Sequence, residues 1–318
     1  MKKIITNILF LILYLIFGFF ILKYSKEVIN SIHFSYSIWL NNIFPTLFPF
    51  FILSHFLIKY GFVEIISEIL KPVVCKLFKT APAASFVFIM SLVSGFPSNA
   101  KYTKELYQNK IITADEATKI LTFTHFSNPL FILGTVSLLF LKNRKVGFLI
   151  LSIHYLTNIL IGLLFRNYSV SKQENTKIHF KNIVNRLKQD NPSFGSILSE
   201  AIKNTMQTLF LILGTITTFL IINTIINQLF SFSSYYQAIF SGLMEMTQGL
   251  KYTSLLSVSL RLKVTLMTMI LSFGGLSVHM QVLSIISDTK IKYLPFFTAR
   301  LLHCAVSGIL VFYLFPLL

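Results

Sequence analysis

Ionisable and polar side chains that interrupt apolar runs are the residues of this sequence best suited to chemistry. Arg300 and His303 stand three positions apart in a run that holds no other charge, and His125 and Asn128 are also three apart. Residues at this spacing share one face of a helix. Charged groups are costly inside a membrane and usually serve function there. Because a guanidinium can grip a carboxylate through two parallel hydrogen bonds, these residues predict a site for a small anion.

Each of these residues also has a purely structural interpretation. A histidine such as His154 or His303 could make only a helix-packing hydrogen bond. Arg300 lies close enough to Lys292 to extend toward the inner membrane surface. Glu245 could lie in water at the tip of a re-entrant hairpin. On the functional hypothesis, Arg300 recognises the anion and Glu245 is a coupling or proton-relay carboxylate.

Two stretches combine polar residues with helix breakers. Residues Ser94–Lys101 read Ser-Gly-Phe-Pro-Ser-Asn-Ala-Lys and end the run Ala81–Val93, which is shorter than the ~20 residues of a spanning helix. The second stretch is Ser272–Gly275. A helix broken at membrane depth is tolerated only where the bared backbone faces protein or a watery cavity. The helix N-termini at such breaks would add partial positive charge that favours binding of an anion. Alternatively, Ser94–Lys101 could be an ordinary helix end at the membrane surface.

The composition places the chain in a membrane. Hydrophobic residues make up 54%, charged residues only 12%, and the mean hydropathy is +0.71. The net charge of +17 does not indicate nucleic acid, because the basic residues lie in the gaps between apolar runs, where they orient a membrane protein. No metalloprotease, serine-hydrolase or phosphate-loop motif occurs, and the two cysteines lack metal-ligand spacing. We expect no enzyme activity, no cofactor and no metal site.

The long apolar runs predict about seven spanning helices. The second should be kinked by Pro45 and Pro49, and a capping box of Thr113 and Glu116 should begin the third. Two shorter stretches, Ala81–Val93 and Tyr235–Gly249, should be broken or re-entrant. The predicted spans are Ile4–Leu22, Tyr36–Ile58, Thr113–Phe140, Val146–Phe165, Thr205–Leu229, Val264–Ile286 and Tyr293–Phe315.

The two halves of the chain echo each other. Lys101-Tyr102-Thr103 recurs as Lys251-Tyr252-Thr253, and His154 matches His303 in the last span of each half. Each half would hold three full spans and one broken segment. Because three is an odd number of crossings, the second half would be inverted relative to the first. Paired broken segments in inverted halves are typical of a transporter binding site. The sequence therefore predicts an all-α polytopic membrane protein of two inverted repeats.

Four regions follow from this arrangement. They are an N-terminal helix and outer loop (1–35), a first repeat (36–165), a basic cytoplasmic linker (166–204) and a second, inverted repeat (205–318). Basic residues favour the segments assigned to the inner face, so the N-terminus and the linker should share the cytoplasmic side. A short helix near residues 178–187 could lie on the inner leaflet, or the linker could be a solvated connector.

Several motifs resemble one family of membrane proteins. The first broken stretch, the segment His125–Phe131, the segment Ser272–Gln281 and the segment Ala299–His303 are similar to the sporulation integral membrane protein YlbJ family. That family belongs to the wider group with a nucleoside-recognition or Gate domain. The resemblance implies transport of dipicolinic acid into the developing spore, from the membrane of a spore-forming bacterial cell.

Three function classes stay open at this point: a carrier of a small organic anion, a carrier of a nucleoside or ion, and a non-transporting membrane scaffold. The expected partners are a small anionic solute and the lipid bilayer, without nucleic acid, and homo-oligomerisation is left open. The expected substrate-binding residues are Ser94, Gly95, Pro97, Ser98, Asn99, His125, Ser127, Asn128, Glu245, Gly274, Gly275, His279, Gln281, Arg300 and His303.

Overall fold

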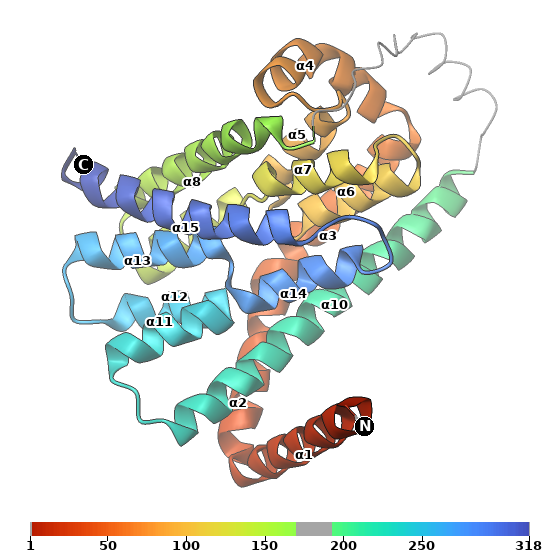
Figure 1. The fold of residues 1–318 in the computed structure, drawn as a ribbon. Helices are drawn as coiled ribbons and strands as arrows, with labels where there is room; N and C mark the ends of the chain where they lie inside the picture. Colours follow the sequence, from red (N-terminus) through yellow and green to blue (C-terminus); the bar gives the residue numbers. More distant parts are fainter. Residues whose placement is uncertain (1, 170–192, 318) are drawn as a thin grey trace.

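In the computed structural model, residues 2–169 and 193–317 are described, and every regular element within these ranges is helical. Figure 1 shows α10 (Phe194–Leu229) crossing the molecule, in contact with α2, α3 and α14 along its length. The elements are α1 (Lys2–Lys23), α2 (Ser25–Ile38), η1 (Trp39–Ile43), α3 (Phe44–Lys59), α4 (Phe62–Phe78), α5 (Ala84–Ser94), α6 (Ser98–Gln108), α7 (Ala114–Phe123), η2 (Phe131–Phe140), α8 (Arg144–Leu164), η3 (Phe165–Asn167), α10 (Phe194–Leu229), α11 (Ser234–Met244), α12 (Met246–Leu255), α13 (Leu260–Phe273), α14 (Gly275–Ile286), α15 (Leu294–Leu314) and η4 (Phe315–Leu317).

Five helical segments of the described chain are long and apolar enough to span a membrane. A sixth is a bent pair, Ser25–Ile43 and Leu47–Lys59, whose two parts meet at 50° around the expected kink at Pro45. The count is lower than the seven expected, because the predicted span Thr113–Phe140 is interrupted. It divides into α7 and the π-helix η2, and neither part reaches spanning length. The five segments are Ile4–Lys23, Arg144–Asn167, Phe194–Leu229, Leu260–Ile286 and Leu294–Leu317.

The first helix, α1, lies at the edge of the bundle beside α2 and α10 (Figure 1). None of its apolar window is buried in protein. Large apolar side chains such as Leu9, Leu15 and Phe19 are exposed along it. This exposure suits contact with lipid, because a soluble protein would bury a helix so uniformly apolar.

Four helix breaks organise the interior: α5/α6, α7/η2, α11/α12 and α13/α14. The sequence predicted broken segments at α5/α6 and α11/α12 and a break at Ser272–Gly275, which is α13/α14, so the break between α7 and η2 is the additional one. Gly95, Gly274 and Gly275 adopt φ values of +78°, +89° and +74°, which favour glycine because a Cβ would clash. Two of the four breaks, α5/α6 and α13/α14, therefore lie at glycines whose backbone conformation would strain other residues.

Caps define the helix boundaries that the sequence predicted. The Thr113 hydroxyl accepts a hydrogen bond from the Glu116 amide at 3.3 Å, and the Thr113 amide donates to the Glu116 carboxylate at 2.8 Å. This capping box is confirmed. The helix α10 begins at Phe194, capped by Ser193, and so starts inside the segment predicted as a linker. The short helix considered near residues 178–187 lies outside the described residues.

The buried apolar side chains form two clusters. The first joins α3 to α7 with α10 and α14, and includes the stacked rings of Phe78 and Phe123, 4.4 Å apart. The second joins η2, α8, α12, α13 and α15. Two of the helix breaks, α7/η2 and α13/α14, lead from one cluster to the other, so close packing holds the helices on either side of them.

Candidate functional site

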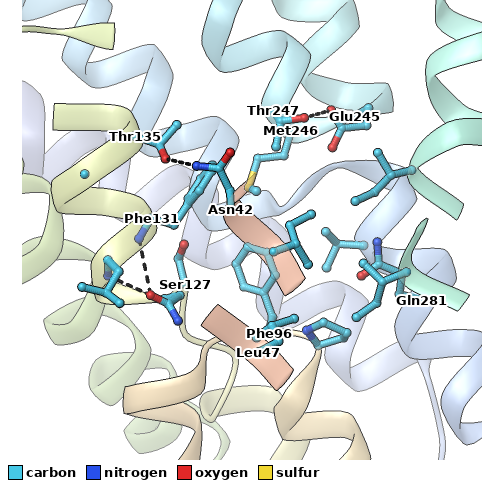
Figure 2. Close-up of a pocket in the computed structure, with 18 of the residues that line it drawn as sticks. Asn42, Leu47, Phe96, Ser127, Phe131, Thr135, Glu245, Met246, Thr247 and Gln281 are labelled. Carbon is cyan, nitrogen blue, oxygen red and sulfur yellow. Dashed lines mark hydrogen bonds between the residues drawn. The ribbon is translucent and has the colours of Figure 1, made fainter. Parts of the chain in front are cut away.

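A cavity of about 350 Å³ lies where the four helix breaks approach one another. Figure 2 shows polar side chains from several helices around a mainly apolar wall. Five of the fifteen predicted site residues line it, namely Pro97, Ser127, Asn128, Glu245 and Gln281. The lining also includes Asn41, Asn42, Leu47, Phe96, Phe131, Gly134, Thr135, Ile212, Ile216, Met246, Thr247 and Val278.

Asn128 joins the first two breaks. Its amide nitrogen donates to the carbonyl of Ser94, at the end of α5, at 3.1 Å. Its side-chain oxygen accepts from the backbone amides of Leu130 at 2.7 Å and Phe131 at 3.4 Å, where the chain returns to helix. One side chain thus satisfies a free carbonyl of one helix and the free N–H groups of the next, which is how a helix can break in a membrane.

The other two breaks are joined in a similar way. The Glu245 carboxylate caps α12 by accepting hydrogen bonds from the Gln248 amide at 2.9 Å and from the Thr247 hydroxyl. Gly275, at the start of α14, lies directly against this turn, since a Cβ there would be 3.0 Å from the backbone nitrogen of Met246. Gly95 has the same relation to Asn128 in the first half. Close backbone contact between breaks therefore occurs in both halves.

A layer of predicted site residues lies behind Phe96 and does not line the cavity. The His125 ring stacks on Phe96 with centroids 4.6 Å apart, and its Nδ1 is 3.3 Å from the Asn99 side-chain oxygen. The hydroxyls of Ser94 and Ser98 are 2.6 Å apart. The stacked imidazole of His125 holds the Phe96 ring in its orientation at the cavity wall.

Two histidines from the two halves meet behind the breaks. The Ser127 amide donates to His154 Nε2 at 2.9 Å, which leaves the proton of a neutral ring on Nδ1, 3.3 Å from the Ser272 hydroxyl. Arg300 donates to His303 Nδ1 at 2.7 Å, so Nε2 of His303 donates to the His154 carbonyl at 3.1 Å. The two rings are 4.6 Å apart. These tautomers follow from the hydrogen-bond network, which holds both histidines neutral.

A third histidine braces the break between α13 and α14. His279 Nε2 donates to the carbonyl of Phe273, the last residue of α13, at 3.1 Å. Its Nδ1 accepts from the Tyr293 hydroxyl at 2.7 Å. Gly274 follows Phe273 in the chain and packs near His125, so it also belongs to the supporting layer.

Arg300 is fully buried and does not line the cavity. Its guanidinium donates to the Thr122 carbonyl at 2.6 Å, the Asn158 side-chain oxygen at 3.0 Å and the His125 carbonyl at 3.4 Å. No carboxylate of the described residues pairs with it. These contacts tie α15 to the unwound chain that follows α7. Recognition of an anion by Arg300 stays a prediction, while the geometry gives this residue a positioning role.

Replacement of Arg300 by glutamine is expected to destabilise the protein strongly. The Thr122 carbonyl and the Asn158 oxygen would lose their donors, and each unsatisfied buried acceptor costs about 1–3 kcal/mol. Thermal unfolding of the detergent-purified protein measures the loss. The matched control is Arg261→Gln, because Arg261 also donates to a carbonyl, that of Phe312 at 2.8 Å, but at an exposed position. Equal unfolding temperatures of the Arg300→Gln and Arg261→Gln variants would show that Arg300 has no positioning role.

Several cavity residues were not predicted as site residues from the sequence. Asn42 donates to the Thr135 hydroxyl at 3.2 Å and so joins the two π-helices η1 and η2 (Figure 2). Short π-helices are frequent at functional sites because they place side chains off the regular helical register. The signal in the sequence was the pair Asn41 and Asn42 inside an apolar span. Within the described ranges, no group of three His, Cys, Asp or Glu could hold a metal ion.

Comparison with known proteins shows the family to which this chain belongs. The sequence model of the Gate family, described as nucleoside recognition, matches residues 40–143, which contain the first two breaks. The sporulation integral membrane protein YlbJ of Bacillus subtilis (strain 168) is 34% identical over 304 residues, 86% of this chain and 74% of the relative. The chain belongs to the YlbJ family. No solved structure matches it. As a YlbJ-family protein with several apolar helices of spanning length, it is an integral protein of the bacterial cell membrane.

Proposed function

We propose that this YlbJ-family protein carries a small organic solute across the membrane and binds it in the cavity between the four breaks. The observation that carries the proposal is the convergence of interrupted helices on one cavity with polar side chains. Irregular backbone at membrane depth is tolerated where it lines such a space, and carriers place their solute there. The similar Bacillus subtilis protein is an integral membrane protein, and the matching family is described as nucleoside recognition, which agrees with a transport role.

We further propose that the two halves form the inverted repeat expected from the sequence. Two observations support it. His154 and His303, at matching places in the halves, lie ring to ring at 4.6 Å, as equivalent residues do when a symmetry axis passes between them. In each half, a glycine at one break also packs on the backbone of the other break. Such halves can rock against each other and expose one site to either side of the membrane.

The favoured solute is a small planar aromatic acid, and the family resemblance names dipicolinic acid, moved into the developing spore. The rings of Phe96 and Phe131 line the cavity and suit a flat aromatic solute. Glu245 is the one lining residue of the described chain with an ionisable side chain. Two carboxylates that approach closely favour uptake of a proton by one of them. Glu245 would thereby couple movement of the acid to movement of a proton.

A nucleoside is the second candidate solute. The lining of the described cavity has the amides of Asn41, Asn42, Asn128 and Gln281 and no lysine or arginine. Amides hydrogen-bond to the edges of nucleobases, which also stack on aromatic rings. The Gate family, whose model matches residues 40–143, is described as nucleoside recognition.

Uptake of radiolabelled dipicolinate and uridine into vesicles that contain only this purified protein tests the proposal and separates the two solutes. The favoured outcome is saturable dipicolinate uptake that excess uridine does not reduce. Saturable uridine uptake with no dipicolinate uptake would select the second candidate. If the protein neither transports nor binds either solute, the carrier proposal for these solute classes fails and a scaffold role gains support.

Glu245→Gln should uncouple transport from the proton gradient. The glutamine oxygen can still cap α12, but the side chain can no longer take up and release a proton. Accumulation of dipicolinate driven by an imposed pH gradient should fall by about tenfold or more, roughly the effect of losing one proton-transfer group. Exchange of internal for external solute should persist. Glu68→Gln is the control, because Glu68 is exposed and does not line the cavity. Gradient-driven accumulation equal in both variants would exclude this coupling role.

A further inference from the structure

A second cavity, of about 470 Å³, lies between α3, α6, α10 and α14. We call it the linker-side cavity because residues near the start of α10, Glu200 and Asn204, line it, and both belong to the segment predicted as the linker. Its lining is polar and charged, in contrast to the first cavity. Lys59, Lys101, Lys104, Glu105 and Glu200 all contribute to it.

Most of the charges in this cavity are already paired. Lys104 contacts Asp288 at 2.7 Å, and Lys59 contacts Glu200 at 3.4 Å. Both are partly exposed surface pairs of small energetic weight. They leave Lys101 as the lysine of the lining that has no ion pair in the described chain.

Lys101 is deeply buried, with 8% of its surface exposed. Its ammonium lies 4.3 Å from the centre of the Phe51 ring, and no hydrogen bond from it to any described residue is present. A buried ammonium without a hydrogen-bond partner is unfavourable, and the nearby Glu105 carboxyl offsets only part of that cost, since the pKa of Lys101 is still lowered. One turn further along α6, the Glu105 oxygen Oε2 is also buried without a hydrogen-bond partner. The cavity thus presents an unpaired donor and an unpaired acceptor one helical turn apart.

We propose that the linker-side cavity is a binding site for a small oxyanion, held by the Lys101 ammonium. An oxyanion that carries a hydroxyl, such as monobasic phosphate, would also donate a hydrogen bond to Glu105. The chemistry is shared by two sources, a free carboxylate or phosphate and the phosphate of an anionic lipid headgroup. The site stands on its own observations and does not require that the chain transports anything.

The position of the cavity favours a free anion as the occupant. Three helices, α3, α10 and α14, line both cavities, and Pro97, the residue that precedes α6, lines the first while Lys101 of α6 lines the second. Phe51 is fully buried on α3, one turn from Leu47 of the first cavity and one turn from His55 of the second. An anion at Lys101 would lie on the approach to the solute cavity from the linker side.

Anion binding should weaken as the pH rises. Lys101 lies in α6, outside the candidate spans, and burial lowers its pKa to about 8. Below that value the ammonium is charged, and above it the charge is lost. Burial raises the pKa of Glu105 to about 7, so this carboxyl gains negative charge over the same interval. The remaining ionisable groups around the cavity are His55, Lys59, Lys104, Glu200 and the neighbouring Asp288.

The experiment is calorimetric titration of the purified protein, in lipid nanodiscs of phosphatidylcholine, with inorganic phosphate and separately with dipicolinate. At pH 6.5 at least one anion should bind, and Lys101→Gln should lower its affinity by about tenfold or more, the effect expected for loss of one charge-assisted hydrogen bond. Lys101→Arg should retain binding. The matched control is Lys251→Gln: Lys251 occupies the equivalent Lys-Tyr-Thr motif and lies 4.5 Å over the Phe34 ring, but is exposed.

Further arms identify the occupant and keep the test decisive. If phosphate no longer binds when the nanodiscs are made of phosphatidylglycerol, the anionic lipid headgroup is the occupant of the same site. Titration of the parent at pH 9 requires no variant to fold, and binding there should be weaker by about tenfold. The proposal is overturned if the parent binds neither anion at pH 6.5, if binding is unchanged at pH 9, or if Lys101→Gln binds as tightly as Lys251→Gln. Absence of solute uptake alone would leave this result intact.

Discussion

Substitution of Gly134 by phenylalanine is expected to abolish solute uptake while the protein stays folded. Gly134 lies in η2 and lines the cavity, and no neighbouring atom lies within 4 Å of where its Cβ would be. A side chain can therefore enter the cavity without displacing packed atoms. An aromatic ring would occupy a large part of the 350 Å³ available. Uptake into vesicles should fall by about tenfold or more, as expected when a ligand loses its pocket.

Gly214→Phe is the matched control for this prediction. Gly214 lies inside α10, is exposed, and also has no neighbour within 4 Å of an added Cβ. Both variants carry the same cost of changing a helical glycine, but only one fills the cavity. Normal uptake by Gly134→Phe would show that solute passes elsewhere.

Substitution of Gly95 by alanine should have the largest effect on folding. A Cβ at Gly95 would lie 2.5 Å from the backbone nitrogen of Asn128 and 2.8 Å from its Cα. The φ of +78° adds strain for any residue with a side chain. Overpacking and backbone strain of about 1–3 kcal/mol each would lower the unfolding temperature by roughly 5–15 °C.

Thermal unfolding in detergent measures this effect against Gly18→Ala. Gly18 lies in α1, where nothing lies within 4 Å of an added Cβ. Alanine there should be neutral or slightly stabilising, because it favours helix. If the two alanine variants unfold at the same temperature, the two breaks are not held in the close contact described.

The sequence predicted the elements that depend on local chemistry. Glycine and proline marked the breaks at Gly95 and Gly275, the Thr113 capping box marked a helix start, and apolar runs marked the spans. It missed the full break after α7, because that break is stabilised by Asn128 contacting residues more than thirty positions earlier in the chain. Non-local hydrogen bonds of this kind leave no periodic signal in the sequence.

Only part of the candidate site could be predicted, because its remaining residues also depend on non-local contacts. Glu245 and Asn128 line the cavity, as expected of polar residues at helix breaks. Arg300 was expected to face a solute because its partners could not be read from the sequence: two of them are backbone carbonyls, which every residue has. The asparagines of η1 reach the cavity only because the kinked second span packs beside η2.

Equilibrium binding of radiolabelled dipicolinate and uridine to the purified Gly134→Phe and Gly214→Phe proteins tests most directly whether the cavity between the four breaks is the solute site. The account predicts that Gly214→Phe binds one of these solutes with the affinity of the parent. Gly134→Phe should bind the same solute about tenfold more weakly or not at all. Equal affinity of the two variants for a solute that the parent binds would contradict the account.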